Sequence, residues 1–523
     1  MSIVYGNYTP PPPPEPSKEE VNIRIGVFFD GTSNNRTNTN ARVAPKEQKE
    51  KDAYKKYGGG DSSYENDLSN VARLEPFYKE TDAYTTKVYI EGIGTEDLKD
   101  DQVYFSSKGV SMGTGPTGVR AKVRKGCEKV VEQILKIKKN ILNKKINTLT
   151  LDVYGFSRGS AAARNFVHEV TKGSYLPIPV NTNNETHGST ESYTDYDGFS
   201  TKRRTIFPAR GHLGLKLEEL KIEIDRVIVR FVGLYDTVSS YDPTNPTYGP
   251  NFKNDVKELD LNSISRAKRI VHLIAEDEHR ENFMVTSIKA ALRVKVATGN
   301  EYVLPGVHSD IGGSYVHGKG EEIQLMDFDN TIGDGYDDEE YDKILMNDRN
   351  HLIEQGWFTP DEVSKKPNTW HETFATRKSI SNRYSYVTLH ILSELGNKNY
   401  ADMFVMENIL SEYKLPNGTE NKYFTVDLNQ VKKRLLDYIE GQNPPMKYYT
   451  NKELKNKKEL LDKGKITTEQ YNIMVNDHNM LMKLRNRYFH FSARTGEIGY
   501  EPHYKFKDKY HIMRLRETAK GSE

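Results

Sequence analysis

Residues 149–166 read LTLDVYGFSRGSAAARNF and combine a buried strand, a sharp turn and a helix in one short stretch. The residues before Gly155 are mostly apolar or β-branched, as in a strand buried in a sheet. Gly155 and Gly159 flank Ser157 in a G-x-S-x-G pattern, in which residues without side chains let the strand and the helix pass closely. The stretch predicts a nucleophile elbow with Ser157 at its apex, although a glycine–serine turn without chemistry has the same pattern.

The composition is that of a large protein with no dominant charge. The chain has 523 residues, which indicates two or three domains or one large domain with insertions. The 75 basic and 74 acidic residues leave a net charge of +1, so no global field favours a nucleic-acid partner. The single cysteine, Cys127, excludes an internal disulfide framework and fits synthesis in a reducing cytoplasm.

Neither a membrane span nor a secretory signal is predicted. We find no apolar run approaching the ~18 residues that a membrane span needs. The first 20 residues lack a basic start and an apolar centre, so we expect a protein that is made in the cytoplasm without a signal peptide. Export would then use a route that does not read such a signal.

Changes in composition divide the chain into four parts. Residues 1–21 are proline-rich and predict an extended tether. We expect an α/β core with loop insertions at 22–320 and a mostly helical cap or membrane-facing region at 321–484. The segment 485–523 is expected to return to the core.

Several elements of the core are predicted from apolar periodicity. The spacing of apolar residues predicts an amphipathic crossover helix from Val119 to Ile141. The stretch 264–274 is expected to be a helix, 41–67 a polar mobile loop and 321–340 a solvated acidic loop. Further core strands are expected at 23–29, 86–90, 226–234 and 302–304.

An aspartate and a histidine follow two of these strands. Asp236 stands at the carboxyl end of the strand at 226–234, where it is placed to orient a histidine. His308 lies in a glycine-rich loop after the strand at 302–304, which suits a general base. The order Ser157, Asp236, His308 is that of the α/β-hydrolase fold.

Other readings of these residues remain open. Asp310 is a competing carboxylate two residues after His308, and His308, Asp310 and Asp30 together are a candidate metal site. The glycine-rich stretch 113–118 matches G-x-G-x-x-G, but no strand leads into it. We therefore favour a rim of the active site over a dinucleotide site there.

Four motifs in a fixed order resemble a known family. They are Phe28-Phe29-Asp30-Gly31-Thr32-x-Asn34, Gly155-x-Ser157-Arg158-Gly159, Gly233-x-Tyr235-Asp236-Thr237-Val238 and Pro305-Gly306-x-His308-x-Asp310-x-Gly312-Gly313. Together they resemble the uncharacterised α/β-hydrolase domain of fungi and bacteria, whose best-known bacterial members are type VI secretion phospholipase effectors of the first lipase class. The match is good over residues 22–320 and thin beyond.

The resemblance implies a role for each motif. Ser157 would be the nucleophile, His308 the base and Asp236 the acid. The backbone amides of Gly31 and Arg158 would form the oxyanion hole, and Asp30 and Asp310 would support the site.

The sequence and the resemblance together predict a serine-dependent ester hydrolase with a Ser-Asp-His triad, an α/β-hydrolase-like, mostly parallel sheet and a helical cap. The expected substrate is phospholipid, with no cofactor and no resident metal. By resemblance the protein would be an antibacterial effector that is loaded onto a secretion spike, acts on a target-cell membrane and has a cognate immunity protein. Two alternatives are an esterase on a soluble or glycan-linked ester and a non-enzymatic binding module on the same fold.

Overall fold

The computed structural model describes residues 20–102, 109–140, 144–176, 178–179, 193–194, 200–201, 206–243, 252–294, 298–327, 338–365, 372–419, 422–497 and 499–522. The predicted proline-rich tether falls almost entirely outside these residues.

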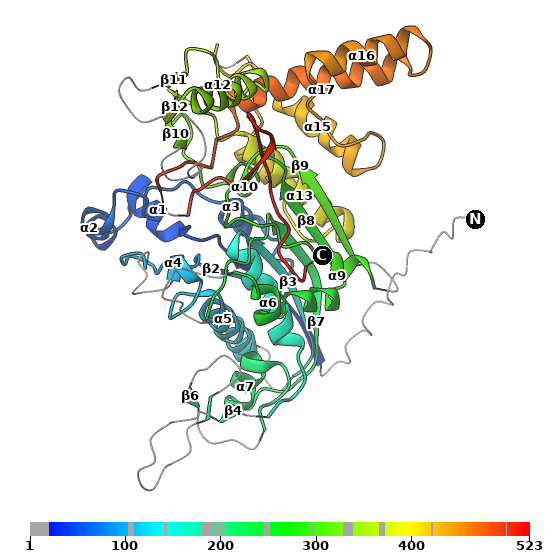
Figure 1. The fold of residues 1–523 in the computed structure, drawn as a ribbon. Helices are drawn as coiled ribbons and strands as arrows, with labels where there is room; N and C mark the ends of the chain where they lie inside the picture. The colour runs from blue at the N-terminus through cyan, green and yellow to red at the C-terminus, as the bar shows by residue number, and fades with distance from the viewer. Residues whose placement is uncertain are drawn as a thin grey trace.

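The centre of the molecule is a six-stranded sheet in which every pairing is parallel (Figure 1). Its order is β2-β1-β3-β7-β8-β9. The strands are β1 (Glu20–Phe29), β2 (Thr85–Ile90), β3 (Lys145–Phe156), β7 (Ile224–Tyr235), β8 (Arg269–Ala275) and β9 (Gly299–Leu304). This confirms the predicted α/β class with a mostly parallel sheet.

Both faces of the sheet are buried because successive side chains point to opposite sides. In β3, Leu151 and Val153 join the core under α5 (Val119–Asn140) and α6 (Arg158–Thr171). Tyr154 and Phe156 join the other core. The elements that pack on this second side are α3 (Asn70–Leu74) and α13 (Tyr384–Asn399).

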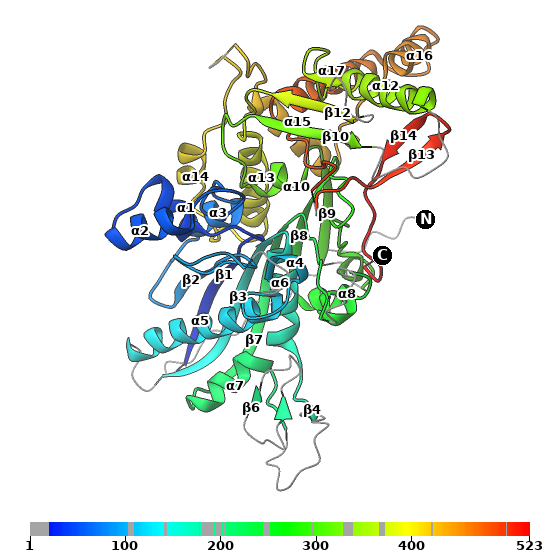
Figure 2. The ribbon, with the colours of Figure 1, turned by 60° about the vertical axis from the view of Figure 1, so that its left-hand side comes forward.

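The second half of the chain builds a region beyond the carboxyl ends of the strands (Figure 2). It contains a small antiparallel sheet in the order β10-β12-β11, which the prediction of a mostly helical region missed. Its elements are β10 (Glu321–Asp327), α12 (Asp338–Glu354), β11 (Val363–Lys365), β12 (Glu372–Arg377), α14 (Met406–Glu412), α15 (Leu428–Ile439), α16 (Asn451–Asp462) and α17 (Thr468–Arg487). A hairpin of β13 (Tyr504–Asp508) and β14 (His511–Arg514) lies beside the small sheet.

Three local predictions are wrong. Most of the stretch 264–274 is not helical: 264–266 end a short 3-10 helix, and from Arg269 the chain is strand β8, whose apolar side chains fill both cores. The expected loop at 41–67 holds the last turn of one capped helix, α1 (Arg36–Val43), and the whole of a second, α2 (Gln48–Tyr57). The start of the expected solvated acidic loop is β10, where Glu321 pairs with the buried Arg377.

Shorter elements connect these layers. They are η1 (Glu75–Phe77), α4 (Gly109–Met112), β4 (Ile178–Pro179), β5 (Tyr193–Thr194), β6 (Ser200–Thr201), α7 (Gly211–Glu219), α8 (Asp255–Glu258), η2 (Leu261–Arg266), α9 (Lys289–Leu292) and α10 (His308–Gly312).

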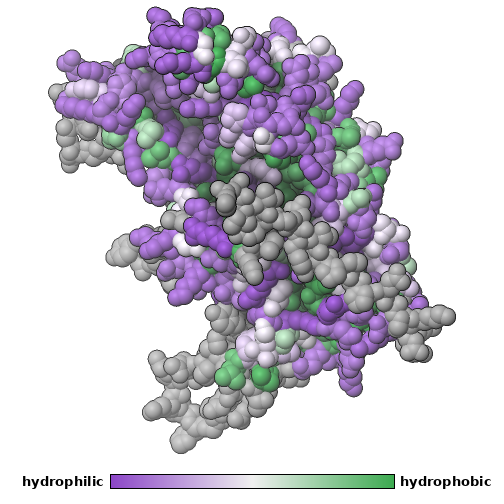
Figure 3. Space-filling view, turned by 90° about the vertical axis from the view of Figure 1, so that its right-hand side faces the viewer, coloured by the Kyte–Doolittle hydropathy of each residue, from purple (hydrophilic) through white to green (hydrophobic). Residues whose placement is uncertain are grey.

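The face in Figure 3 is mostly hydrophilic, with hydrophobic residues in small separate groups. Among the described helices, none has the length and apolar character needed to cross a bilayer.

Candidate active site

Ser157 occupies a strained turn between β3 and α6. Its backbone has φ 57° and ψ −131°, a conformation that non-glycine residues rarely adopt. A Cβ on Gly155 would lie 2.5 Å from Ser160 Cα, and one on Gly159 would lie 2.1 Å from the Asp30 carbonyl oxygen. Both flanking glycines are therefore required by close backbone approach, and the predicted elbow geometry is present.

Asp236 follows β7, the strand beside β3. The Ser157 amide donates to the carbonyl of Tyr235 at 3.1 Å, so the serine and the aspartate leave the sheet side by side. Asp236 is fully buried, and its Oδ1 accepts the amide of Ala275 at 3.0 Å. These contacts hold the carboxylate at the carboxyl edge of the sheet.

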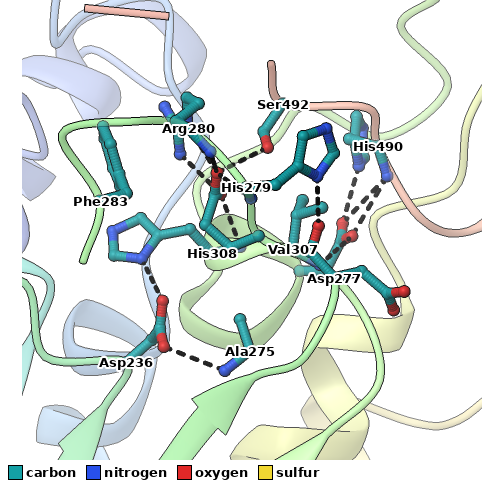
Figure 4. A network of polar contacts seen from close by, with 12 residues as sticks. Asp236, Ala275, Asp277, His279, Arg280, Phe283, Val307, His308, His490 and Ser492 are labelled. Atoms are coloured by element: carbon teal, nitrogen blue, oxygen red, sulfur yellow. Dashed lines mark hydrogen bonds and ion pairs between the residues drawn. The ribbon is translucent and has the colours of Figure 1, made fainter. Parts of the chain in front are cut away.

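His308 begins the short helix α10, which follows β9. Its Nδ1 lies 2.5 Å from Asp236 Oδ2, as Figure 4 shows. The imidazole packs between two rings, with centroid distances of 4.7 Å to Phe156 and 5.0 Å to Phe283. Phe156 immediately precedes Ser157, so the histidine lies against the elbow.

The other ring nitrogen of His308, Nε2, has no hydrogen-bond partner in the described structure. Nε2 is buried and makes no hydrogen bond to any residue that the structure describes, Ser157 included. Because Nδ1 faces a carboxylate, the proton of a neutral ring resides on Nδ1 and the lone pair on Nε2. A catalytic hydrogen bond is often long in the free enzyme and tightens when substrate binds.

The electrostatics separate an anionic aspartate from a neutral histidine. Burial raises the pKa of Asp236, but the opposing effects of Arg516 and His308 hold that pKa well below its usual range. Burial lowers the pKa of His308, and its hydrogen bond to Asp236 offsets this only in part. The pair can therefore accept a proton at Nε2 near neutral pH.

The loop after Asp30 is held by a buried carboxylate. Asp30 accepts the hydroxyls of Ser69 and Tyr89, and its Oδ1 also accepts the Gly31 amide at 2.7 Å. Burial raises the pKa of Asp30 above its usual value. In this structure the Gly31 amide is therefore engaged, and the side chain of Asp30 fixes the loop.

Arg158 connects the elbow to that loop. It begins α6, so its amide has no acceptor within the helix. Its Nε donates to Thr32 Oγ1 at 2.8 Å, and its Nη1 donates to the Val110 carbonyl. Val110 belongs to α4, just before the glycine-rich stretch 113–118, which places that stretch near the elbow as a rim rather than after a strand.

Asp310 has a different partner from Asp236. Its carboxylate accepts the amides of Val307 and His490 and lies 2.9 Å from His490 Nδ1. Tyr315 stacks on that second histidine at 3.6 Å between centroids. Asp310 thus secures the first turn of α10, and its described hydrogen bonds do not include the His308 ring.

The metal reading is not supported by this arrangement. Asp30, His308 and Asp310 each have separate partners, and in the described part of the chain no three histidine, cysteine or acidic side chains gather as a metal site.

Three polar residues near His308 have no role in the sequence prediction. Glu278 accepts the His308 amide at 3.3 Å and pairs with Arg280, and Arg516 pairs with Asp236. Glu278 and Arg280 belong to the motif Ala275-x-Asp277-Glu278-x-Arg280, which strengthens the family resemblance. The sequence therefore contains a signal for these two residues. Arg516 follows no motif, and only the fold brings it to the site.

Comparisons with known proteins give the family. Residues 24–329 match the family described as type VI secretion phospholipase effector Tle1-like, catalytic domain. No curated protein matches the sequence.

Two solved structures resemble the chain at low identity. One is described as the Tle1 effector bound to the VgrG spike of the type 6 secretion system. It has 19% identity and a TM-score of 0.49, over 96% of this chain and 90% of the other. The other, an uncharacterised protein from Pseudomonas aeruginosa, has 16% identity and a TM-score of 0.35, over 90% of this chain and 64% of the other.

Since the family match spans more than half of the 523 residues and includes the elbow, Asp236 and His308, this chain belongs to the Tle1-like family of type VI secretion phospholipase effectors.

Proposed function

We propose that the protein is a serine-dependent carboxylic ester hydrolase that cleaves acyl chains from phospholipids. The observation that carries the proposal is the 2.5 Å contact between His308 Nδ1 and Asp236 Oδ2, beside an elbow serine and with Nε2 unoccupied. Family membership supports phospholipid as the substrate class.

The reaction would follow from the positions of these groups. His308 Nε2 takes the hydroxyl proton of Ser157 as its oxygen attacks the ester carbonyl, and Asp236 stabilises the imidazolium that forms. His308 then returns the proton to the leaving alcohol. In the second half of the reaction, His308 takes a proton from water as the water attacks the acyl-enzyme, and it returns that proton to the Ser157 oxygen as the acid leaves. No cofactor is needed for either step.

The oxyanion would be stabilised by backbone amides. Arg158 offers an amide at the start of α6, where the helix dipole also favours negative charge. The proposed second donor, the Gly31 amide, would have to leave Asp30 Oδ1 as the oxyanion develops.

The biological setting is proposed from the family alone. A type VI effector would be loaded onto the secretion spike, act on the membrane of a target cell and require a cognate immunity protein in its producer. The region 321–484 would then serve as a lid or membrane-facing cap above the site. The two alternative functions are an esterase that acts on a soluble or glycan-linked ester and a non-enzymatic binding module.

The test is release of fatty acid from phospholipid vesicles by wild type and by Ser157→Ala. Ser160→Ala is the matched control, because it removes a neighbouring hydroxyl in α6, which donates to the Tyr235 carbonyl at 3.1 Å. We expect activity in wild type and in Ser160→Ala, and none above background in Ser157→Ala.

Other outcomes separate the alternatives, provided that circular dichroism shows equal folding of all three proteins. Hydrolysis of soluble short-chain esters without hydrolysis of vesicles would favour the soluble-ester reading. Wild-type protein that is inert on both substrates would overturn the proposal and favour a binding module.

A further inference from the structure

Four carboxylates near His308 are contacted by the last part of the chain. Four acidic side chains near the histidine each contact a residue beyond position 484, outside the segment 24–329 that matches the catalytic-domain family. The pairs are Asp236 with Arg516, Asp277 with Arg485, Glu278 with Ser492, and Asp310 with His490. Figure 4 shows Ser492 and His490 approaching the site on a separate stretch of chain.

Arg516 makes the most direct of these contacts. Its Nη1 and Nη2 lie 2.7 and 2.8 Å from Asp236 Oδ1 and Oδ2, a bidentate ion pair with both side chains buried. Its Nε donates to the Phe283 carbonyl at 2.9 Å, and Nη1 also donates to the Ala275 carbonyl at 2.8 Å. The guanidinium is thus fixed from three sides and cannot rotate away from Asp236 without breaking several bonds.

These bonds complete the coordination of the Asp236 carboxylate. A carboxylate offers about four lone-pair sites. Here they meet the Ala275 amide, His308 Nδ1 and the two Arg516 nitrogens. Without Arg516, two sites of a fully buried anion would lack a donor, and the carboxylate could turn away from the imidazole.

We propose that Arg516 is a positioning residue of the active site: its guanidinium fixes the Asp236 carboxylate in the orientation that holds His308 and sets the charge balance around the imidazole. This inference rests on the proposed function of Ser157, Asp236 and His308. It makes the C-terminal segment a functional part of the catalytic site.

The charge balance follows from the groups that face the histidine. Two anions, Asp236 and Glu278, and two cations, Arg280 and Arg516, surround His308. A neutral imidazole leaves this buried group without net charge, and a protonated one makes it positive. Removal of the Arg516 charge therefore favours the imidazolium and moves the acid limb of the activity profile to higher pH.

The experiment measures kcat and KM of the full-length protein on a soluble short-chain ester across pH, for wild type, Arg516→Lys and Arg516→Gln. We expect Arg516→Gln to lower kcat about 10- to 100-fold with KM unchanged, and to shift the acid limb upward by about one pH unit. Arg516→Lys keeps the charge but loses the bidentate geometry, so kcat should fall while the acid limb stays close to that of wild type.

Arg514→Lys is the matched control. Arg514 lies two residues earlier and makes a comparable bidentate ion pair, with Asp348, but does not touch Asp236. This variant should retain the kcat and the acid limb of wild type. If Arg514→Lys instead gave the same pH profile as Arg516→Gln, the loss of activity would come from disturbed folding of the C-terminal segment. The proposal would then be overturned.

Three further outcomes would overturn the positioning role of Arg516. Active wild type with Arg516 variants of unchanged kcat and unchanged acid limb would overturn the positioning role alone. Failure of both Arg516 variants to fold would mean that the guanidinium serves the fold, which also overturns it. Wild type that neither cleaves esters nor reacts with a fluorophosphonate at Ser157 would remove the proposed function and this inference together.

Discussion

The ring of Phe156 lies against the imidazole of His308, with centroids 4.7 Å apart and planes inclined by 33°. Phe156 is the last residue of β3 and precedes Ser157, so the side chain that ends the elbow strand also packs against the proposed general base. Gly312 also lies against the Phe156 ring and leaves no room for a side chain, since a Cβ there would lie 1.9 Å from Phe156 Cε2.

Gly312→Ala should therefore disturb the site without changing a reactive group. The added methyl must displace the Phe156 ring or the end of α10, and overpacking of this kind costs about 1–3 kcal/mol of unfolding free energy. We expect a lower kcat together with lower stability in urea denaturation. Gly173→Ala is the matched control, because a Cβ at Gly173 meets nothing within 4 Å. Equal behaviour of the two variants would contradict the packing argument.

Asp236→Asn and Asp310→Asn distinguish the two candidate acids. Asp236 contacts the His308 ring, so its amide variant should lose about 10⁴-fold in kcat through loss of the imidazolium partner and of the correct tautomer. Asp310 contacts His490 and the Val307 amide instead, so Asp310→Asn should chiefly lower the melting temperature. A folded Asp310→Asn protein with the larger kcat loss would move the acid assignment to Asp310.

The activity of wild type should persist below the ordinary histidine pKa. Burial lowers the pKa of His308 from the reference value of 6.5, and the base is active only when neutral. As pH falls, kcat/KM on a soluble ester should therefore decline with a midpoint below pH 6.5. An acid limb centred above 6.5 would contradict this, unless unfolding monitored by circular dichroism accounts for it.

Much of the core could be predicted because its signals are local. The alternation in β1, β3 and β7, the glycines around Ser157 and the position of Asp236 after its strand are all contained in short stretches of sequence. The same reasoning failed at 264–274, where an almost continuous apolar run fits a buried strand as well as a buried helix. It failed at 41–67, where a cap at Asn35 and a capping box at Glu47 outweigh the polar composition.

The support of the site could not be predicted because it is non-local. His308 and Asp236 are 72 residues apart, but they follow β9 and β7 of the same parallel sheet, with only β8 between these strands. The order of nucleophile, acid and base along the chain is also that of a known fold. Arg516 and Asp236 are 280 residues apart, and nothing around Arg516 distinguishes it from other arginines in the sequence. The contact depends on the path of the chain after the hairpin of β13 and β14, which brings Arg516 back to the core.

The stability of the fold should fall in mild acid because buried histidines are kept neutral. Burial lowers the pKa of both His279 and His390 to about 4 from the reference value of 6.5. A depressed histidine pKa contributes stability that is present above 6.5 and is lost as pH falls toward 4, since the unfolded chain binds the proton first. Between about pH 7 and pH 5 each residue should cost about 2 kcal/mol of unfolding free energy.

Urea denaturation of wild type and His390→Leu at both pH values checks this: the variant should lose about 2 kcal/mol less than wild type over that interval. An equal loss in the two proteins would show that His390 takes no part in the acid sensitivity.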